Sequence, residues 1–362
     1  MFVFGTSPNL KRDKRIVPGD RRRFAFCIIV FSFILLIATS IVSLTVGASG
    51  TSLIDALILW SLGEKIGLRE SVILFDIRAP RTLMGVMVGA SLAVSGAVMQ
   101  GLFRNPLADP GLVGVSAGAG LGAILAIVLG GMLPPAIATL TGIYTVPIAA
   151  FLGGWLTTML LYKVSTNRGR TSVAVMLLAG IAVGALSGAL SGILVYMADD
   201  TQLRDLTFWG LGSLAGSTWA KFAVAAPLIV LALATTPFLA KGLNGLTLGE
   251  AAAEHLGIRV QRMKNVAILT VAGATGAAVA VSGGIGFVGI VVPHLLRLII
   301  GPDHRYLLPA SAMLGASLLL VADMISRTII APAELPIGIV TATIGGPFFL
   351  YILLRNRGIL DM

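Results

Sequence analysis

The chain has 362 residues, of which 56% are hydrophobic and 12% are charged, and its mean hydropathy of +0.96 lies outside the range of soluble domains. The formal net charge of +10 could suggest a nucleic-acid partner, but the cations lie in loops between apolar runs and do not alternate with aromatic residues on a soluble surface. Composition therefore excludes nucleic-acid binding and predicts an all-α polytopic membrane protein.

Apolar runs follow one another along almost the whole chain. Residues 1–23 form a basic tail, and residues 24–362 form the predicted transmembrane domain. About ten spans are expected within that domain, at 24–46, 82–101, 112–132, 144–162, 172–197, 222–240, 266–281, 287–300, 306–326 and 337–354. With the tail inside, most of the 26 Lys and Arg residues fall on the cytoplasmic side, so both termini are predicted to be cytoplasmic.

Two spans carry similar small-residue segments. Residues 89–96 (GASLAVSG) and 276–283 (GAAVAVSG) differ at only two positions, and the predicted topology runs their spans in opposite directions. This pattern is typical of the inverted repeats found in many transporters.

Glycines recur every fourth residue along the fifth predicted span. Such a stripe of bare backbone lets another helix approach closely. Close helix packing is the simpler interpretation, and a lining of a substrate path or a subunit interface is compatible with it. The stripe consists of Gly180, Gly184, Gly188 and Gly192.

A polar segment at residues 247–264 separates two apolar runs and is predicted to face the cytoplasm. Thr247 and Glu250 have the spacing of a capping box, and Gly257 then interrupts the helix, so two short helices are expected. A charged segment of this kind either offers a surface to a cytoplasmic partner or merely connects two spans. The spacing leaves both possibilities open.

Several kinds of chemistry are missing from the sequence. No phosphate-binding P-loop motif occurs, so this chain is not expected to hydrolyse ATP. The glycines of residues 284–289 match a dinucleotide fingerprint but lie between two apolar spans, where a close helix turn explains them better. The single cysteine, Cys27, and the three unclustered histidines predict no disulfide, no metal site and no catalytic site.

Ionisable residues within the spans are almost absent. Asp323 is the one acid, and it stands four residues before Arg327, so the two can pair on a helix. A carrier that works alone by coupling to ions, or an intramembrane enzyme, would bury more such groups along its path. An ion-coupled carrier is kept as the more remote alternative.

Dense motifs distributed from Arg78 to the C-terminus resemble the FecCD family, the permease subunits of type II ABC importers for vitamin B12, ferric siderophores and haem. The resemblance rests on residues 78–82 (RAPRT), 95–116, 247–264, 286–297 (GFVGIVVPHLLR), 301–309 (GPDHRYLLP) and 333–343 (AELPIGIVTAT).

The resemblance implies an inverted-repeat permease fold with ten helices in the bacterial inner membrane. It also implies a homodimer whose central path is lined by the fifth and tenth helices, a separate ATPase subunit and an extracytoplasmic substrate-binding protein. ATP and Mg would belong to the ATPase, so no cofactor is expected on this chain. Overall likeness favours haem as the cargo, with a ferric siderophore or vitamin B12 as alternatives.

The same resemblance assigns two polar sites. The segment 247–264 would carry the coupling helices, and its residues in contact with the ATPase would be Glu250, Ala251, His255, Leu256 and Gly257. On the outer face, Arg78, Arg81 and Arg327 would receive acidic side chains of the binding protein. Each arginine could instead be an interfacial anchor, or, for Arg327, a partner of Asp323.

Overall fold

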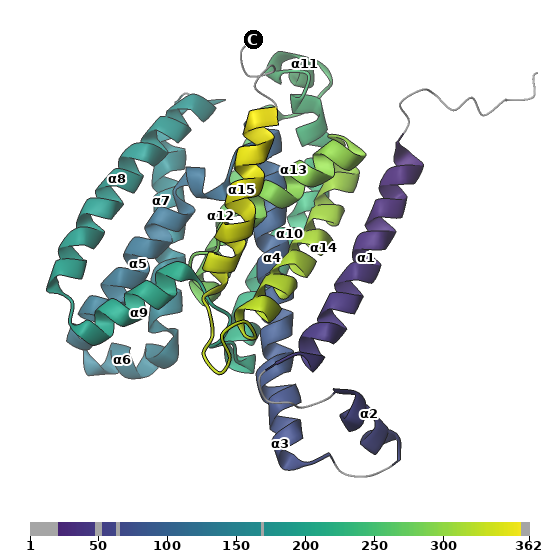
Figure 1. Ribbon diagram of the computed structural model, residues 1–362. Coiled ribbons are helices and arrows are strands. Elements are labelled where there is room, and N and C mark those ends of the chain that lie inside the picture. The colour runs from purple at the N-terminus through teal and green to yellow at the C-terminus, as the bar shows by residue number, and fades with distance from the viewer. Residues whose placement is uncertain (1–20, 48–52, 63–65, 168–169, 356–362) are drawn as a thin grey trace, which may run out of the picture.

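The computed structural model describes residues 21–47, 53–62, 66–167 and 170–355, and these residues are almost entirely helical (Figure 1). The first half contains α1 (Arg22–Thr45), α2 (Leu53–Ser61), α3 (Leu68–Ser71), the π-helix η1 (Val72–Arg78), α4 (Ala79–Leu102), η2 (Pro110–Val113), α5 (Val115–Leu129), η3 (Gly130–Met132), α6 (Pro135–Thr141), η4 (Gly142–Tyr144) and α7 (Thr145–Ser165). A two-residue antiparallel ladder, β1 (Thr166–Asn167) with β2 (Arg170–Thr171), leads into the second half. That half contains α8 (Val173–Met197), α9 (Asp200–Leu211), α10 (Trp219–Leu246), α11 (Glu250–His255), α12 (Val260–Ser282), α13 (Val288–Ile300), α14 (His304–Ser326) and α15 (Ile337–Arg355).

Ten apolar helical stretches lie within the described residues, as the sequence predicts. Eight are long enough to cross a membrane, and α13 and α15 contribute two shorter ones. A helix suits this setting because it satisfies its own backbone hydrogen bonds where lipid supplies none. The predicted basic tail lies mostly outside the described residues, since α1 begins at Arg22.

The segments between spans contain more helix than the sequence predicts. The second span begins at Leu68, where α3, η1 and α4 form one continuous stretch, whereas the sequence predicts that it begins at residue 82. Helix α9 was not predicted, and a capping box starts it: the Asp199 carboxylate accepts from the Gln202 backbone, and the Gln202 side chain accepts from the Asp199 backbone. Hydropathy does not detect such amphipathic helices because their polar faces lower the average.

Helices α4 and α12, which carry the two similar segments, form the centre of the bundle. In the apolar window that includes α4, 83% of the residues are buried, against 11% for α8. The two central helices meet where the Ser91 hydroxyl donates to the Ala274 carbonyl at 3.0 Å. Close approach needs bare backbone: a Cβ on Gly96 would collide with the carbonyl oxygen of Gly289 in α13. The repeated small residues thus pack the core.

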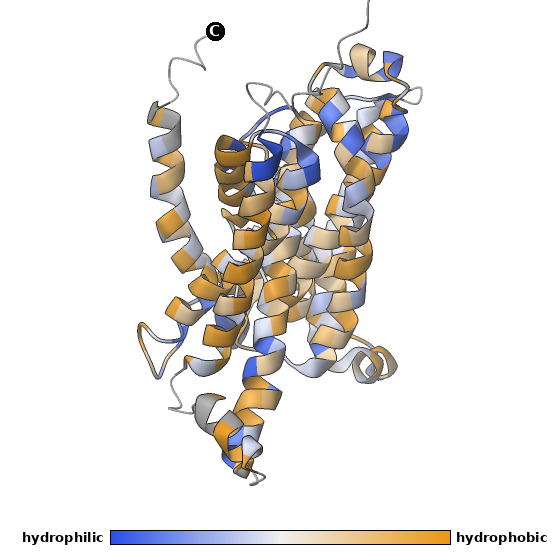
Figure 2. Ribbon diagram, turned by 90° about the vertical axis from the view of Figure 1, so that its right-hand side faces the viewer, coloured by the Kyte–Doolittle hydropathy of each residue, from blue (hydrophilic) through white to orange (hydrophobic). Residues whose placement is uncertain are grey.

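The bundle has two polar ends separated by an apolar belt (Figure 2). Helix α11 lies at one end, together with the beginning of α1 and the end of α15 (Figure 1). The opposite end carries α2, α3, α6 and α9. We call them the α11 end and the α9 end; the start of the first span and the end of the last lie on the same side, as an even number of spans requires.

Candidate functional sites at the two ends of the bundle

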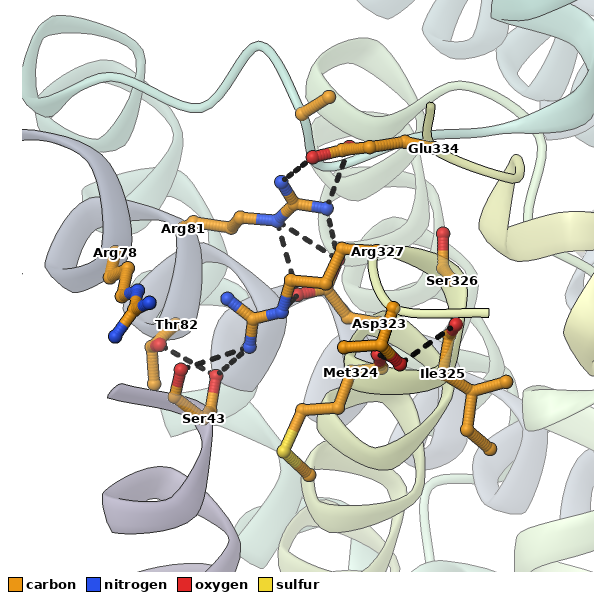
Figure 3. Close-up of polar contacts among 12 residues, drawn as sticks. Ser43, Arg78, Arg81, Thr82, Asp323, Met324, Ile325, Ser326, Arg327 and Glu334 are labelled. Carbon is orange, nitrogen blue, oxygen red and sulfur yellow. Dashed lines mark hydrogen bonds and ion pairs between the residues drawn. The ribbon is translucent and has the colours of Figure 1, made fainter. Parts of the chain in front are cut away.

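Three arginines predicted to dock a binding protein lie together at the α9 end (Figure 3). Arg78 and Arg81 stand on either side of the junction of η1 with α4, and Arg327 follows the last residue of α14. Two carboxylates, Asp323 of α14 and Glu334 of the loop before α15, complete the group. We call these five residues the arginine cluster.

Arg81 holds both carboxylates of the cluster. Its Nε and Nη2 donate to the Asp323 carboxylate at 2.9 to 3.1 Å. Its Nη1 and Nη2 donate to the two oxygens of Glu334 at 2.8 and 3.0 Å. Forked pairing of this kind is short, directional and roughly twice as strong as a neutral hydrogen bond. Arg81 therefore fixes the start of α4 against both the end of α14 and the following loop.

The other two arginines bind the end of α1. Arg327 Nη2 donates to the Ser43 carbonyl at 2.9 Å and to its hydroxyl at 2.8 Å, while Arg327 Nε lies 3.6 Å from Asp323. The predicted helical pair of Asp323 with Arg327 is thus present, although Arg81 is the closer partner. Arg78 Nη1 donates to the carbonyls of Leu44 and Thr45 at 2.7 and 2.9 Å.

Burial distinguishes the members of the arginine cluster. Arg78, Arg81 and Arg327 are at most 5% exposed as residues and Asp323 is 0% exposed, whereas the Glu334 side chain is 37% exposed. The cluster carries three positive and two negative charges, so it keeps one net positive charge at the α9 end. In this structure solvent meets a carboxylate first, and the arginines predicted to dock the binding protein lie beneath it. Docking through Arg81 would have to displace or bypass Glu334.

The polar segment at the α11 end differs from its prediction in two respects. It contains one short helix, α11, because Arg262 and Lys264 already belong to α12. The capping box is wrong: Thr247 directly follows α10 and its hydroxyl donates to the Asn244 carbonyl, while Gly249, with φ of 99°, stands at the start of α11. A left-handed backbone favours glycine there, which overrides the capping spacing.

The five residues predicted to contact an ATPase lie on α11 and the turn after it. Glu250 is the first residue of α11 and His255 is the last. Both are exposed, and so are Ala251, Leu256 and Gly257. Leu256 is 64% exposed, and Leu248, just before α11, is 67% exposed. Contact with an ATPase stays a prediction, and an exposed apolar side chain beside charged ones is suitable for it.

A second polar group joins the same end of the bundle to the start of α8. Lys264 Nζ donates to the Glu250 carboxylate at 2.7 Å and to the Thr171 carbonyl at 3.1 Å. Gln261 also binds Thr171, accepting from its backbone N–H at 2.9 Å and donating to its hydroxyl at 2.6 Å. Residues of α11, α12 and β2 are therefore linked by side chains.

A third group caps α14 at the α11 end. Asn244 of α10 donates to the Asp303 carboxylate at 2.7 Å, and its oxygen accepts from the His304 backbone at 2.8 Å. Hydrogen bonds from Arg305 lower the pKa of Asp303 to about 2, aided by the bond from Asn244 and opposed by partial burial. Asp303 thus stays ionised and holds α10 and α14 together.

Three of the four stripe glycines of α8 have open space beside them in the part of the chain that the structure describes. A Cβ at Gly184, Gly188 or Gly192 would meet no atom within 4 Å. Large apolar side chains on the same helix, such as Leu178 and Ile181, are more than two thirds exposed. Among the described residues these three glycines thus serve no close helix packing, and the stripe, with Gly180, stays a predicted path lining or subunit interface.

Sequence reasoning missed Glu334, Gln261 and Thr171 as members of these groups. No spacing rule connects residue 81 with 334, or 171 with 264, because the partners belong to elements far apart in the sequence. The one signal for Glu334 in the sequence is that it lies in the family motif 333–343, shortly after Arg327.

Comparison with known proteins agrees with this architecture. Residues 33–355 match the model of the FecCD transport family. The hemin transport system permease protein HmuU of Yersinia pestis is 45% identical over 327 residues, which are 90% of this chain and 95% of that protein. The cobalamin import system permease protein BtuC of Halobacterium salinarum is 44% identical over 79% of this chain and 74% of that protein.

A solved structure shows the same fold. An inward-facing ABC transporter described as of the metal-chelate type superposes with a TM-score of 0.79 and 32% identity, covering 91% of this chain and 99% of that one. Membership of one family thus explains the inverted-repeat helical architecture, the ten apolar stretches and the polar motifs. This chain belongs to the FecCD transport family and is a multi-pass membrane permease.

Proposed function

We propose that this chain is the membrane-spanning subunit of an ABC importer and that its cargo is haem. The assignment of haem as the substrate rests on the 45% identity to a hemin permease over 95% of that protein's length. The bundle supports a transport role without chemistry of its own, because α8 carries no charged side chain and polar groups gather at the two ends.

The two ends have complementary roles in this proposal. At the α11 end, Glu250, Ala251, His255, Leu256 and Gly257 receive a separate ATPase subunit, which binds ATP and Mg and supplies the energy. This end faces the cytoplasm of a bacterial cell, in agreement with the predominance of Lys and Arg on that side. At the α9 end, the net positive arginine cluster, with Arg78, Arg81 and Arg327, attracts acidic side chains of a substrate-binding protein.

A second copy of the chain completes the path. The open stripe of α8 (Gly180, Gly184, Gly188 and Gly192) and the shorter apolar helix α15 face that copy, so that the cargo passes along weakly interacting backbone and apolar surface. Binding of the loaded protein, closure of the ATPase subunits and movement of α11 would then alternate access to this path.

A second candidate cargo is vitamin B12, favoured by the 44% identity to a cobalamin permease. The deciding experiment is ATP-dependent uptake into liposomes that contain this chain, its ATPase and its binding protein, with haem, a ferric siderophore and vitamin B12 compared. We expect uptake of haem alone. Uptake of another of these compounds alone would overturn the haem assignment and leave the importer, whereas uptake without the ATPase would favour an ion-coupled carrier.

A further inference from the structure

We propose that Lys264 is the positioning residue that transmits movement of α11 to the path-lining helix α8; this inference rests on the proposed function. The starting point is the place of the Lys264 ammonium group. It contacts the Glu250 carboxylate on α11 at 2.7 Å and the Thr171 carbonyl of β2 at 3.1 Å. One side chain on α12 thereby bridges the predicted coupling helix and the residue two positions before α8 begins.

Burial makes this bridge energetically demanding. The Lys264 side chain is 5% exposed, while its partner Glu250 is 49% exposed. A buried ammonium is costly unless it is paired and hydrogen-bonded. If an ATPase pulled Glu250 away, Lys264 would stay buried without its counterion. The cheaper response is for α12 and β2 to move together with α11, which is the behaviour of a mechanical link.

The far side of the bridge is built to hold the start of α8. Thr171 receives Lys264 at its carbonyl and Gln261 at both its N–H and its hydroxyl. The next residue, Ser172, caps α8 by accepting from the Val175 N–H. Thr171, just before α8, is thus tied to α12 through its backbone N–H, its carbonyl and its side-chain hydroxyl.

Helix α8 packs against neighbouring helices on one side and is open along its glycine stripe, so it can move as a rigid helix. Its contacts are with α5, α7 and η2, and its glycine stripe is open. Displacement of Thr171 would therefore tilt α8 without breaking a close contact at Gly184, Gly188 or Gly192. The bridge joins the α11 end to a helix that is free to move on its path side.

The test is the number of substrate molecules transported per ATP hydrolysed by the complete complex in liposomes. Lys264→Met keeps the apolar stem and removes the charge, and Lys264→Arg keeps the positive charge and has N–H donors for both Glu250 and Thr171. We expect Lys264→Met to keep ATP hydrolysis within about twofold and to lower the transport ratio at least tenfold, a factor that corresponds to about 1.4 kcal/mol of lost coupling. Lys264→Arg should recover most of the ratio.

The matched control is Lys241→Met, which removes an exposed lysine from the same end of the bundle. If Lys264→Met fails to assemble with the ATPase, Gln261→Met removes the two neighbouring hydrogen bonds to Thr171 and should lower the ratio likewise. A purely structural role would reduce transport and hydrolysis together and leave their ratio unchanged.

A second measurement follows the movement directly. Spin labels at exposed positions Glu254 on α11 and Arg170 on β2, in a background with Cys27 replaced by Ala, should keep one separation with and without trapped ATP. In Lys264→Met that separation should change between the two states. An unchanged transport ratio in Lys264→Met overturns the inference alone, whereas a wild-type complex that transports none of the three compounds overturns the proposed function and the inference with it.

Discussion

Arg81 and Glu334 face each other across the α9 end through two parallel hydrogen bonds of 2.8 and 3.0 Å, although 252 residues separate them in the chain. The guanidinium is buried, and the carboxylate side chain is 37% exposed to solvent. Glu334 therefore covers the residue that a docking protein is proposed to use. The affinity of the binding protein for the α9 end then depends on how easily one of its carboxylates replaces that of Glu334 at Arg81.

Replacing Glu334 by Gln should strengthen docking of the binding protein. An ion pair with one partly exposed partner contributes roughly 1 kcal/mol or less, so its loss should raise the affinity for an acidic partner by as much as about fivefold. The measurement is the dissociation constant of the binding protein at low salt, and the gain should shrink as salt is raised. Asp200→Asn, an equal charge change at the same end, is the control, and an unchanged or weaker affinity in Glu334→Gln would argue against competition at Arg81.

Replacing Arg81 by Met should destabilise the fold itself. Asp323 is 0% exposed, and without Arg81 its nearest cation is Arg327 at 3.6 Å. Removing one partner of a buried ion pair costs about 3 to 5 kcal/mol. Thermal unfolding in detergent should show a clearly lowered midpoint, while Arg69→Met, an exposed arginine on α3, should leave it unchanged. Equal midpoints for both variants would mean that Arg81 is not required for the fold.

Glycines of the core and of the α8 stripe should respond oppositely to a methyl group. Gly96→Ala should destabilise the chain by about 1 to 3 kcal/mol, since its Cβ would collide with the Gly289 backbone. Gly188→Ala places its Cβ in open space within the chain and should leave the unfolding midpoint of the isolated chain unchanged or raised. Gly188→Leu should also fold but should reduce uptake. Loss of folded protein in both Ala variants would refute this division of roles.

Asp303 should make a pH-dependent contribution to stability. Its pKa is about 2 in the folded chain, below its ordinary value of 3.8, so ionised Asp303 stabilises the fold above pH 4. That contribution should disappear as pH falls through the folded pKa. The difference in unfolding midpoint between the wild type and Asp303→Asn should therefore be constant from pH 5 to 7 and shrink between pH 4 and 2. A difference that grows on acidification would contradict the assignment.

Much of the architecture follows from local sequence. Apolar runs require helices because lipid cannot satisfy backbone groups, and they locate the ten stretches, although the second and the fourth begin earlier than predicted, at Leu68 and Pro135. The similar segments 89–96 and 276–283 indicate the inverted repeat, because the predicted topology runs their spans in opposite directions. Their small residues also predict close helix packing. The pair of Asp323 with Arg327 follows from helical spacing alone.

The tertiary structure decided what these residues contact. No local rule assigns Asp323 to Arg81 before Arg327, covers Arg81 with Glu334, or joins Lys264 to Thr171, because in each pair the partner comes from a distant part of the chain. The glycine stripe shows the same limit: its spacing predicts a bare face, and only the packing of the other helices leaves that face open. Periodicity and hydropathy act within a helix, whereas burial and ion pairing depend on how helices meet.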